Sequence, residues 1–199
     1  VTDHVIWVGA NDRRLNLFEN LFPIPRGVSY NAYLIKDEKN ALMDTVDASA
    51  SEQFIENVAY ALNGGKLDYL VVQHMEPDHS ASIPAFLKKY PKATVVSTAK
   101  GFQFMEQFFP EFFAGQGLPA EQRIVAANDG VLELGQHSLH FVYAPMVHWP
   151  EVMMTYEATE KILFAADGFG KFGALDVEEE WTDEARRYYI GIVGKYGPQ

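Results

Sequence analysis

The segment Leu70-Val71-Val72-Gln73-His74-Met75-Glu76-Pro77-Asp78-His79-Ser80 places four ionisable side chains within six positions, directly after an apolar run typical of a buried strand. In an extended backbone successive side chains alternate between two faces, so His74, Glu76 and Asp78 would point to one side and His79 to the other. Acids and imidazoles that converge in this way repel one another or stay unsatisfied unless a cation lies between them. The segment therefore predicts a metal site, and the alternative is a solvated acidic loop with a capping histidine.

The proline within this segment favours the extended geometry. Pro77 biases Glu76 toward extended backbone angles and prevents a helix from running back through the loop. We expect Ser80 to cap the helix that follows.

Two later segments also place a candidate metal ligand at the end of an apolar run. His148 follows the run that begins at Phe141, and Asp167 follows Ile162-Leu163-Phe164-Ala165-Ala166. Loops at strand ends are common positions for functional side chains, because the strand fixes where the side chain begins. Alone, such an aspartate is more often a turn former and such a histidine a packed residue. Together, the three segments indicate one shared metal site.

The composition limits the chemistry that this site can carry. The 199 residues are 48% hydrophobic and 22% charged, which is typical of a packed soluble protein. The absence of cysteine excludes thiolate metal sites, cysteine nucleophiles, disulfides and iron–sulfur clusters, so a metal would be bound by nitrogen and oxygen. A net charge of −11 disfavours nucleic acid as a partner. Apolar stretches fall well short of the roughly 20 residues of a membrane span, so we expect a cytoplasmic protein with no membrane partner.

The distribution of apolar residues predicts a mixed α/β fold. Strand-like segments rich in β-branched and aromatic residues lie at 4–9, 29–35, 41–46, 69–73, 94–97, 123–126, 138–143 and 152–156. Helical periodicity occurs at 51–62, 83–90, 101–109 and 182–193. Because the early and late strands follow one another without helices, we expect hairpins and an antiparallel component. We assign residues 1–199 to one domain.

These motifs resemble those of the flavodiiron proteins. The resemblance rests on the H-x-E-x-D-H pattern from His74 to His79, on His148-Trp149-Pro150 and on Asp167-Gly168-Phe169-Gly170, and it covers most of the chain, including 29–35 and 44–47. It implies a metallo-β-lactamase-like αββα sandwich with mixed sheets. Other proteins of that fold typically have H-x-H-x-D-H and a binuclear zinc site, and Glu76 stands where their second histidine would be. A carboxylate makes the site harder and more negative, which favours iron over hydrolytic zinc.

The resemblance also implies a ligand set for two non-haem iron ions. His74, Glu76 and His148 would bind one iron, Asp78 would bind the other, and Asp167 would bridge the two. His79 is a near neighbour that binds in some settings and not in others.

Two features of the family pattern are missing from this sequence. The family's second iron takes a histidine from a later His-Gly loop, whereas this chain has no histidine after His148. Family members also continue into a flavodoxin-like domain that holds FMN, and nothing in these 199 residues resembles the phosphate-binding loop of that domain. We therefore expect a fragment, incomplete at the C-terminus, whose remainder was lost or lies in a complementary chain that carries the missing ligand. The alternative is a shortened relative with an open or mononuclear site.

The family implies a function in the reduction of small gases. We expect an oxidoreductase that converts dioxygen to water, nitric oxide to nitrous oxide, or both, with electrons from rubredoxin or a flavin reductase through FMN, in a homodimer or higher oligomer. The alternatives are a binuclear zinc hydrolase of the same fold and a catalytically silent iron or gas-binding module. We expect His137 and His140 to be dispensable for the metal, and Trp149, Tyr188 and Tyr189 to serve mainly in packing.

Overall fold

The computed structural model describes residues 1–114, 117–178 and 180–198. Its larger sheet has six strands in the spatial order β1 (Val5–Trp7), β6 (Tyr33–Ile35), β7 (Ala41–Met43), β8 (Tyr69–Val71), β9 (Thr94–Ser97) and β10 (Arg123–Val125). β1, β6 and β7 pair antiparallel, whereas β7, β8, β9 and β10 run parallel. The mixed sheet predicted from the order of strands and helices is confirmed.

Helices cover one face of this sheet. They are α1 (Ser51–Leu62), α3 (Ile83–Lys89), α4 (Ala99–Phe108) and the short α5 (Pro110–Phe113). α1 buries Phe54 and Val58, which lie one turn apart on its apolar face, and Asn63 ends the helix with a left-handed φ of 46°. Because the helices cover one face of the strands and a second sheet covers the other, β7 is apolar and buried at all three positions.

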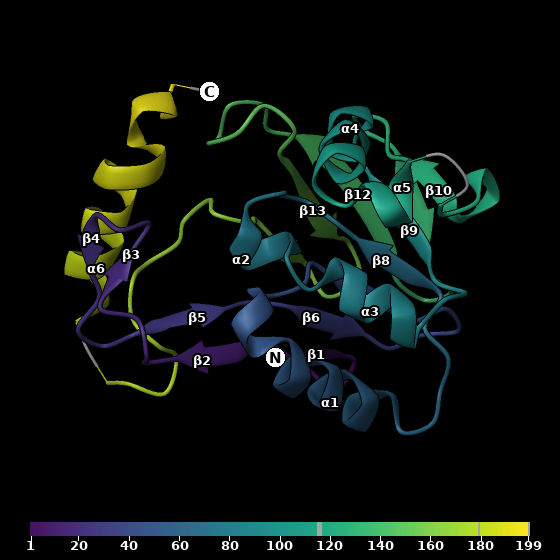
Figure 1. Cartoon of the computed structure of the whole chain (residues 1–199), viewed down its shortest axis with the longest axis horizontal. Helices are drawn as coiled ribbons and strands as arrows, with labels where there is room; N and C mark the ends of the chain where they lie inside the picture. The colour runs from purple at the N-terminus through teal and green to yellow at the C-terminus, as the bar shows by residue number, and fades with distance from the viewer. Residues whose placement is uncertain (115–116, 179, 199) are drawn as a thin grey trace.

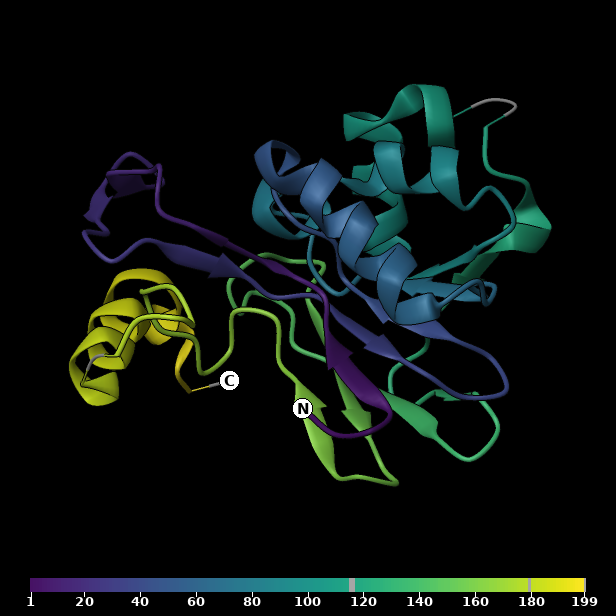
Figure 2. The same cartoon turned by 90° about the horizontal axis from the view of Figure 1, so that it is seen from below.

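The second sheet packs against the opposite face of the first. Its four strands are β11 (Val131–Glu133), β12 (Ser138–Tyr143), β13 (Met153–Glu157) and β14 (Ile162–Phe164), all antiparallel. Met43 and Val71 of the first sheet meet Phe141 and Met153 of the second in a continuous buried cluster. Figure 2 shows this order of layers, with the helices on one side of the six-stranded sheet and the four-stranded sheet on the other.

Segments from the early and late parts of the chain come together beside the sandwich. Two small antiparallel pairs are formed by β2 (Ala10–Asp12) with β5 (Val28–Tyr30), and by β3 (Leu17–Phe18) with β4 (Phe22–Pro23). α6 (Trp181–Tyr188) lies next to β3 and β4 in Figure 1, and Arg187 donates to the carbonyl of Pro23 at 2.7 Å. α6 continues into the π-helical turn η3 (Tyr189–Val193) and the 3₁₀ turn η4 (Gly194–Tyr196). Short 3₁₀ turns η1 (Ala48–Ala50) and η2 (Ala120–Gln122) complete the elements.

The expected αββα order would place helices on the outer faces of both sheets. In the described residues, helices cover the outer face of the six-stranded sheet but not that of the four-stranded sheet. α1, α3 and α4 cover the six-stranded sheet, and α6 lies to one side. The outer face of the four-stranded sheet leaves Val142, Tyr156 and Leu163 between 37% and 47% exposed. The mixed α/β sandwich is thus confirmed, and its layers are most complete on the helical side of the larger sheet.

Three local predictions are wrong. Residues 29–35 form two strands, because the chain leaves its pairing with β2 and then pairs with β1. Pro77 begins a helical turn, α2 (Pro77–Ser80), as proline at the first helical position often does, so the extended alternation ends at Glu76. Ser80 caps no helix, and its hydroxyl donates to the carbonyl of Met75 at 2.8 Å.

Strands β2, β3, β4 and β11 lie outside the predicted segments. Each has only two or three residues, and their pairing partners, rather than a run of apolar residues, hold them extended. In the described residues, no helix is long and apolar enough to cross a bilayer.

Candidate metal centre

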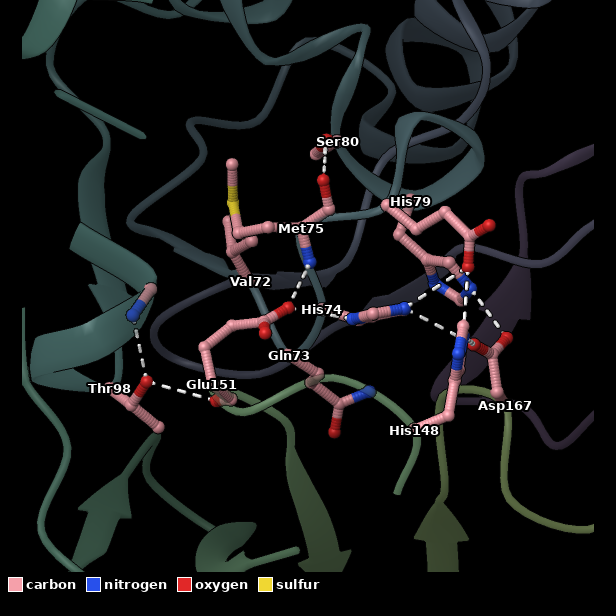
Figure 3. A network of polar contacts seen from close by, with 12 residues as sticks. Val72, Gln73, His74, Met75, His79, Ser80, Thr98, His148, Glu151 and Asp167 are labelled. Carbon is pink, nitrogen blue, oxygen red and sulfur yellow. Dashed lines mark hydrogen bonds and ion pairs between the residues drawn. The ribbon is translucent and has the colours of Figure 1, made fainter. Parts of the chain in front are cut away.

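The predicted ligands meet at one end of the strands. His74 and Glu76 follow β8, His148 lies in the connection from β12 to β13, and Asp167 follows β14. The imidazoles of His74 and His148 and the carboxylate of Asp167 point toward one another in Figure 3. Strand ends from both sheets therefore deliver side chains that are far apart in sequence to one point.

The first group of donor atoms consists of His74, Glu76, His148 and Asp167, whose ligand atoms all lie within 4.8 Å of one another. Nε2 of His148 lies 2.9 Å from Glu76 Oε2 and 2.9 Å from Asp167 Oδ2. Nε2 of His74 lies 3.3 Å from Glu76 Oε2 and 3.2 Å from Asp167 Oδ2. Two imidazoles and two carboxylates thus surround a single point.

A second group consists of Asp78, His79 and Asp167. Nε2 of His79 lies 3.0 Å from Asp167 Oδ1 and 3.8 Å from Asp78 Oδ2. Asp78 joins this group because it lies on the helical turn α2, whereas an extended chain would have placed it with His74 and Glu76. Asp167 belongs to both groups, with Oδ2 toward the first and Oδ1 toward the second, which is the arrangement of a bridging carboxylate.

Glu151, which the sequence reasoning missed, holds His74 from behind. Its Oε1 accepts from Nδ1 of His74 at 2.7 Å and from the backbone N–H of Met75 at 2.8 Å. Its backbone carbonyl accepts from the hydroxyl of Thr98 at 3.0 Å. A carboxylate on Nδ1 fixes the tautomer in which Nε2 is free to bind a metal. The only sequence signal was its place directly after the His148-Trp149-Pro150 motif.

Asp44, at the end of β7, plays a similar part behind the second group. It accepts from the backbone N–H of Gln73 at 2.7 Å and lies 3.4 Å from Nδ1 of His79. The sequence resemblance included residues 44–47 without giving Asp44 a role. Its position after an apolar strand was the available signal.

Mutual ion pairing shifts the pKa values of the first group. Burial lowers the pKa of His74, but the close contacts with the carboxylates of Asp167 and Glu151 outweigh it and raise the pKa well above its ordinary value. For His148, burial also lowers the pKa, and contacts with Asp167 and Glu76 raise it to about 9. Burial raises the pKa of Glu76, and hydrogen bonds from His148 and His74 bring it down to about 2. The imidazoles therefore carry protons that balance the acids.

The second group is balanced in the same way. Burial raises the pKa of Asp78 to about 7, because the attraction of His79 is offset by the repulsion of Asp167. Burial lowers the pKa of His79, and the charges of Asp78 and Asp167 raise it well above the ordinary value. Burial favours a raised pKa for Asp167, but His79 and His148 hold it well below its usual range. A divalent cation would supply the same positive charge and release these protons.

The donor set fits metal ions on two further counts. Asp78 Oδ1 is buried and has no hydrogen-bond partner, and Asp167 Oδ2 contacts its neighbours as an ion pair without hydrogen-bond geometry. A buried carboxylate oxygen without a donor is costly unless a cation satisfies it. Nitrogen and oxygen ligands in these proportions suit iron and other first-row divalent metals.

Aromatic side chains shield the site. The ring of Trp149 packs edge to face on His74, with centroids 5.2 Å apart. Tyr188 of α6 packs on Phe172 and also donates its hydroxyl to Asp167 Oδ1 at 2.9 Å, so its role exceeds the packing we expected from the sequence. Tyr189 is 49% exposed.

A cavity of about 510 Å³ opens beside the second group. Residues from both chain ends line it together with the candidate ligands, among them Tyr30, Asp78, His79, Asp167, Trp181 and Tyr188. A small molecule that enters this cavity reaches the face of Asp78 and Asp167.

Glu19 is a further acid that the sequence reasoning missed. It lies between β3 and β4 and forms a hydrogen bond with Glu76, and its partial burial and this contact raise the pKa of Glu19 to about 7. His137 and His140 lie elsewhere: His137 contacts Asp37 at 2.8 Å, and His140 contacts the hydroxyl of Ser138.

Comparison with known proteins places this geometry in a family. A family model described as "ODP family beta lactamase" matches residues 28–192. The nitric oxide reductase of Moorella thermoacetica is 37% identical over 97% of this chain and 49% of its own length.

Two solved structures superpose closely on this chain. The rubredoxin oxygen:oxidoreductase of Desulfovibrio gigas superposes with a TM-score of 0.88 at 32% identity, over 100% of this chain and 49% of that one. The flavodiiron protein of Giardia intestinalis gives a TM-score of 0.86 at 27% identity, over 99% of this chain and 48% of that one. The chain thus spans about half the length of the relatives it matches.

Proposed function

Because this chain belongs to the ODP family of beta-lactamase-like proteins, with flavodiiron proteins as relatives, we propose that it forms the iron-binding part of a reductase of dioxygen or nitric oxide. The proposal treats residues 1–199 as one metal-binding domain. It is supported by the names of the relatives and by the two groups of donor atoms that share Asp167.

The ligand set we propose follows the two groups. His74, Glu76 and His148 hold one iron, and Asp78 holds the other, with Asp167 between them. We assign His79 to the second iron, because its Nε2 lies 3.0 Å from the oxygen of Asp167 that faces that group. The second iron would take a further ligand from another polypeptide segment, as the family pattern implies.

Two adjacent ferrous ions would supply electrons to dioxygen or to a pair of nitric oxide molecules bound in the cavity. The residues of this chain determine where that chemistry takes place. Glu151 and Asp44 fix the orientation of His74 and His79, so the donor atoms are in place before metal binds. Trp149 packs on His74 and helps to exclude water from the site.

Tyr188 brings a hydroxyl donor to the edge of the site. Burial and the charge of Asp167 raise the pKa of Tyr188 well above its ordinary value, so its phenol stays protonated and donates to Asp167 Oδ1. We propose that this hydrogen bond sets the angle of the Asp167 carboxylate.

The bridging position of Asp167 carries the proposal, and the substitution Asp167→Asn tests it. The amide keeps the shape of the side chain but removes one anionic oxygen. We expect the wild-type chain, loaded anaerobically with ferrous iron, to bind two iron ions and the variant to lose the pair while its circular dichroism is unchanged. Asp68→Asn is the matched control, since Asp68 lies at the opposite end of β8 and pairs with Lys66. Equal iron content in Asp167→Asn and the wild type, measured by elemental analysis, would overturn the ligand set.

Turnover requires a source of electrons, which we propose to be reduced FMN held by a flavodoxin-like domain and recharged by rubredoxin or a flavin reductase. We also propose that the protein forms a homodimer or a higher oligomer. Its proposed location is the cytoplasm. The iron-loaded chain supplied with photoreduced FMN should consume nitric oxide or dioxygen over many turnovers and faster than photoreduced FMN alone, whereas the same chain without FMN should stop after a single turnover. A chain that takes up zinc, excludes iron and hydrolyses esters would instead indicate the binuclear hydrolase.

A further inference from the structure

Two histidines and a glutamate meet at the end of the strands opposite to the candidate metal centre. His4 precedes β1, His137 precedes β12, and Glu160 lies in the turn from β13 to β14. In Figure 2 the N-terminus lies beside the sheet that contains this turn. The three residues lie in three separate segments of the chain. No single stretch of sequence therefore holds several candidate ligands that would reveal the group.

The donor atoms of these three residues all lie within 4.8 Å of one another. Nδ1 of His4 lies 2.9 Å and Nε2 of His137 3.5 Å from Glu160 Oε1, and the two rings have centroids 5.1 Å apart. Around a tetrahedral zinc ion with bonds of about 2.0–2.1 Å, neighbouring ligand atoms lie about 3.3 Å apart. The two spacings to Glu160 bracket that value, so a zinc ion fits with a small adjustment of the exposed His4 side chain.

Asp37 prepares His137 for this role. Its Oδ2 accepts from Nδ1 of His137 at 2.8 Å and from the backbone N–H of His137 at 2.7 Å. The side chains of both residues are only 3% exposed. Metal-binding histidines usually donate their second nitrogen to a carboxylate in this way, which leaves Nε2 aimed at the metal.

The backbone N–H of Glu160 is hydrogen-bonded, and one of its carboxylate oxygens, Oε2, is buried. Its N–H donates to Glu157 Oε2 at 2.7 Å, and Glu157 is fully buried. Oε2 of Glu160 is itself buried and accepts no hydrogen bond of good geometry, and the hydroxyl of Thr2 is the neighbouring donor that most lowers the pKa of this carboxyl. A buried carboxylate oxygen next to two imidazoles is a second observation, beyond the clustering, that points to a bound cation.

The local charge agrees with a divalent cation. With neutral imidazoles, the carboxylates of Asp37, Glu157 and Glu160 are three negative charges within one corner of the protein. Two protonated histidines would offset two of these three charges only by placing two cations with ring centroids 5.1 Å apart. One Zn²⁺ supplies the positive charge from a single point and lets both imidazoles act as neutral ligands.

We propose that His4, His137 and Glu160 form a zinc site, with Asp37 as the carboxylate that orients His137 and water in the fourth position. The site fastens the segment before β1 to the turns of the four-stranded sheet, and so ties residues that are 133 and 156 positions apart (137 − 4 and 160 − 4). Its role is structural, and it is independent of iron at the other end of the strands.

A zinc titration against a chromophoric chelator tests this site by counting ions. Because the candidate iron centre also takes up zinc, the comparison is made in the Asp167→Asn background, where that uptake is removed or reduced. We expect this protein to bind one zinc ion more than the same protein with His4→Ala. His4 is exposed, so its loss should not unfold the chain. His140→Ala is the matched control, since His140 lies on the same sheet and its ring contacts the hydroxyl of Ser138 rather than the proposed zinc ligands.

A second variant and a second readout separate a metal site from an ion-pair cluster. Glu160→Gln keeps the shape of the side chain and should also lose one zinc ion. Added zinc should raise the unfolding temperature of the Asp167→Asn protein by several degrees and leave that of the His4→Ala double variant unchanged. Equal zinc counts with and without His4, or an equal zinc-induced rise in unfolding temperature, would overturn the proposal and leave an ion-pair cluster only.

Discussion

The carboxylate of Glu151 holds His74 on the side away from the other ligands. Its loss should let the imidazole rotate and change tautomer, although Glu151 itself touches no metal position. For Glu151→Gln we expect iron affinity to fall by roughly 10–100-fold, as is typical when the carboxylate behind a metal-binding histidine is removed. Glu133→Gln, on the edge strand β11, is the control. Competition with a ferrous chelator measures the affinity, and an unchanged value would show that Glu151 serves only to pack.

Protonation of the imidazoles predicts a pH dependence of stability for the metal-free protein. The pKa of His148 rises from 6.5 to about 9 on folding, because Asp167 and Glu76 favour its charged form. A raised folded pKa contributes stability that is fully present below pH 6.5 and is lost as pH rises through 9. Thermal unfolding should therefore occur at progressively lower temperature between pH 6.5 and 9, and His148→Gln should flatten this dependence. A melting temperature that rises over that range in the wild type would contradict the ion pairing.

Metal uptake should release the same protons. Calorimetric titration with ferrous iron at pH 7, repeated in buffers of different ionisation enthalpy, should show net proton release, because three charged imidazoles give way to neutral ligands. Iron affinity should therefore rise with pH up to about 9, the pKa of His148. Proton-neutral binding would indicate that the imidazoles do not coordinate.

At the scale of elements, Thr98 links the start of α4 to the candidate metal centre. Its hydroxyl accepts from the N–H of Gly101 at the first turn and donates to the carbonyl of Glu151. We expect Thr98→Ala to lower the free energy of unfolding by about 1–2 kcal/mol through the lost cap. Thr98→Ser keeps both hydrogen bonds and is the control. Urea denaturation measures the difference, and equal losses in the two variants would assign the effect to the methyl group instead.

The elements also show what the sequence could predict. Residues 51–62 coincide with α1 because Phe54 and Val58 recur at helical spacing and Asn63 stops the helix. His148 and Asp167 were found because each follows a run of strand-forming residues. The assignment of Asp78 to the same face as His74 was wrong, because Pro77 starts a helical turn there. No local pattern distinguishes a proline that blocks a helix from one that begins it.

Local sequence patterns could not predict residues whose roles depend on partners far away in the sequence. Glu151, Asp44 and Glu19 acquire their roles from partners 77, 35 and 57 positions away (151 − 74, 79 − 44 and 76 − 19). Only the closure of the two sheets brings these pairs together.

At the scale of the whole molecule, the interface between the sheets holds the candidate ligands in register. Phe141 of β12 is 2% exposed and packs among residues of both sheets. Phe141→Ala should therefore lower the free energy of unfolding by about 3–5 kcal/mol. Iron affinity should fall as well, because His148 and Asp167 lie in loops of the four-stranded sheet, which the lost side chain would allow to shift. Tyr60→Ala, at an 89% exposed position on α1, should change neither quantity. A loss of stability with full iron affinity would show that the ligands are placed by their loops alone.

The central claim is that two iron ions lie on either side of the Asp167 carboxylate. Anomalous diffraction at the iron absorption edge, from crystals of the chain loaded with ferrous iron, tests it most directly. The account predicts two peaks, one among His74, Glu76 and His148 and the other beside Asp78 and His79, with one oxygen of Asp167 toward each. A single peak, or none within reach of Asp167, would contradict it.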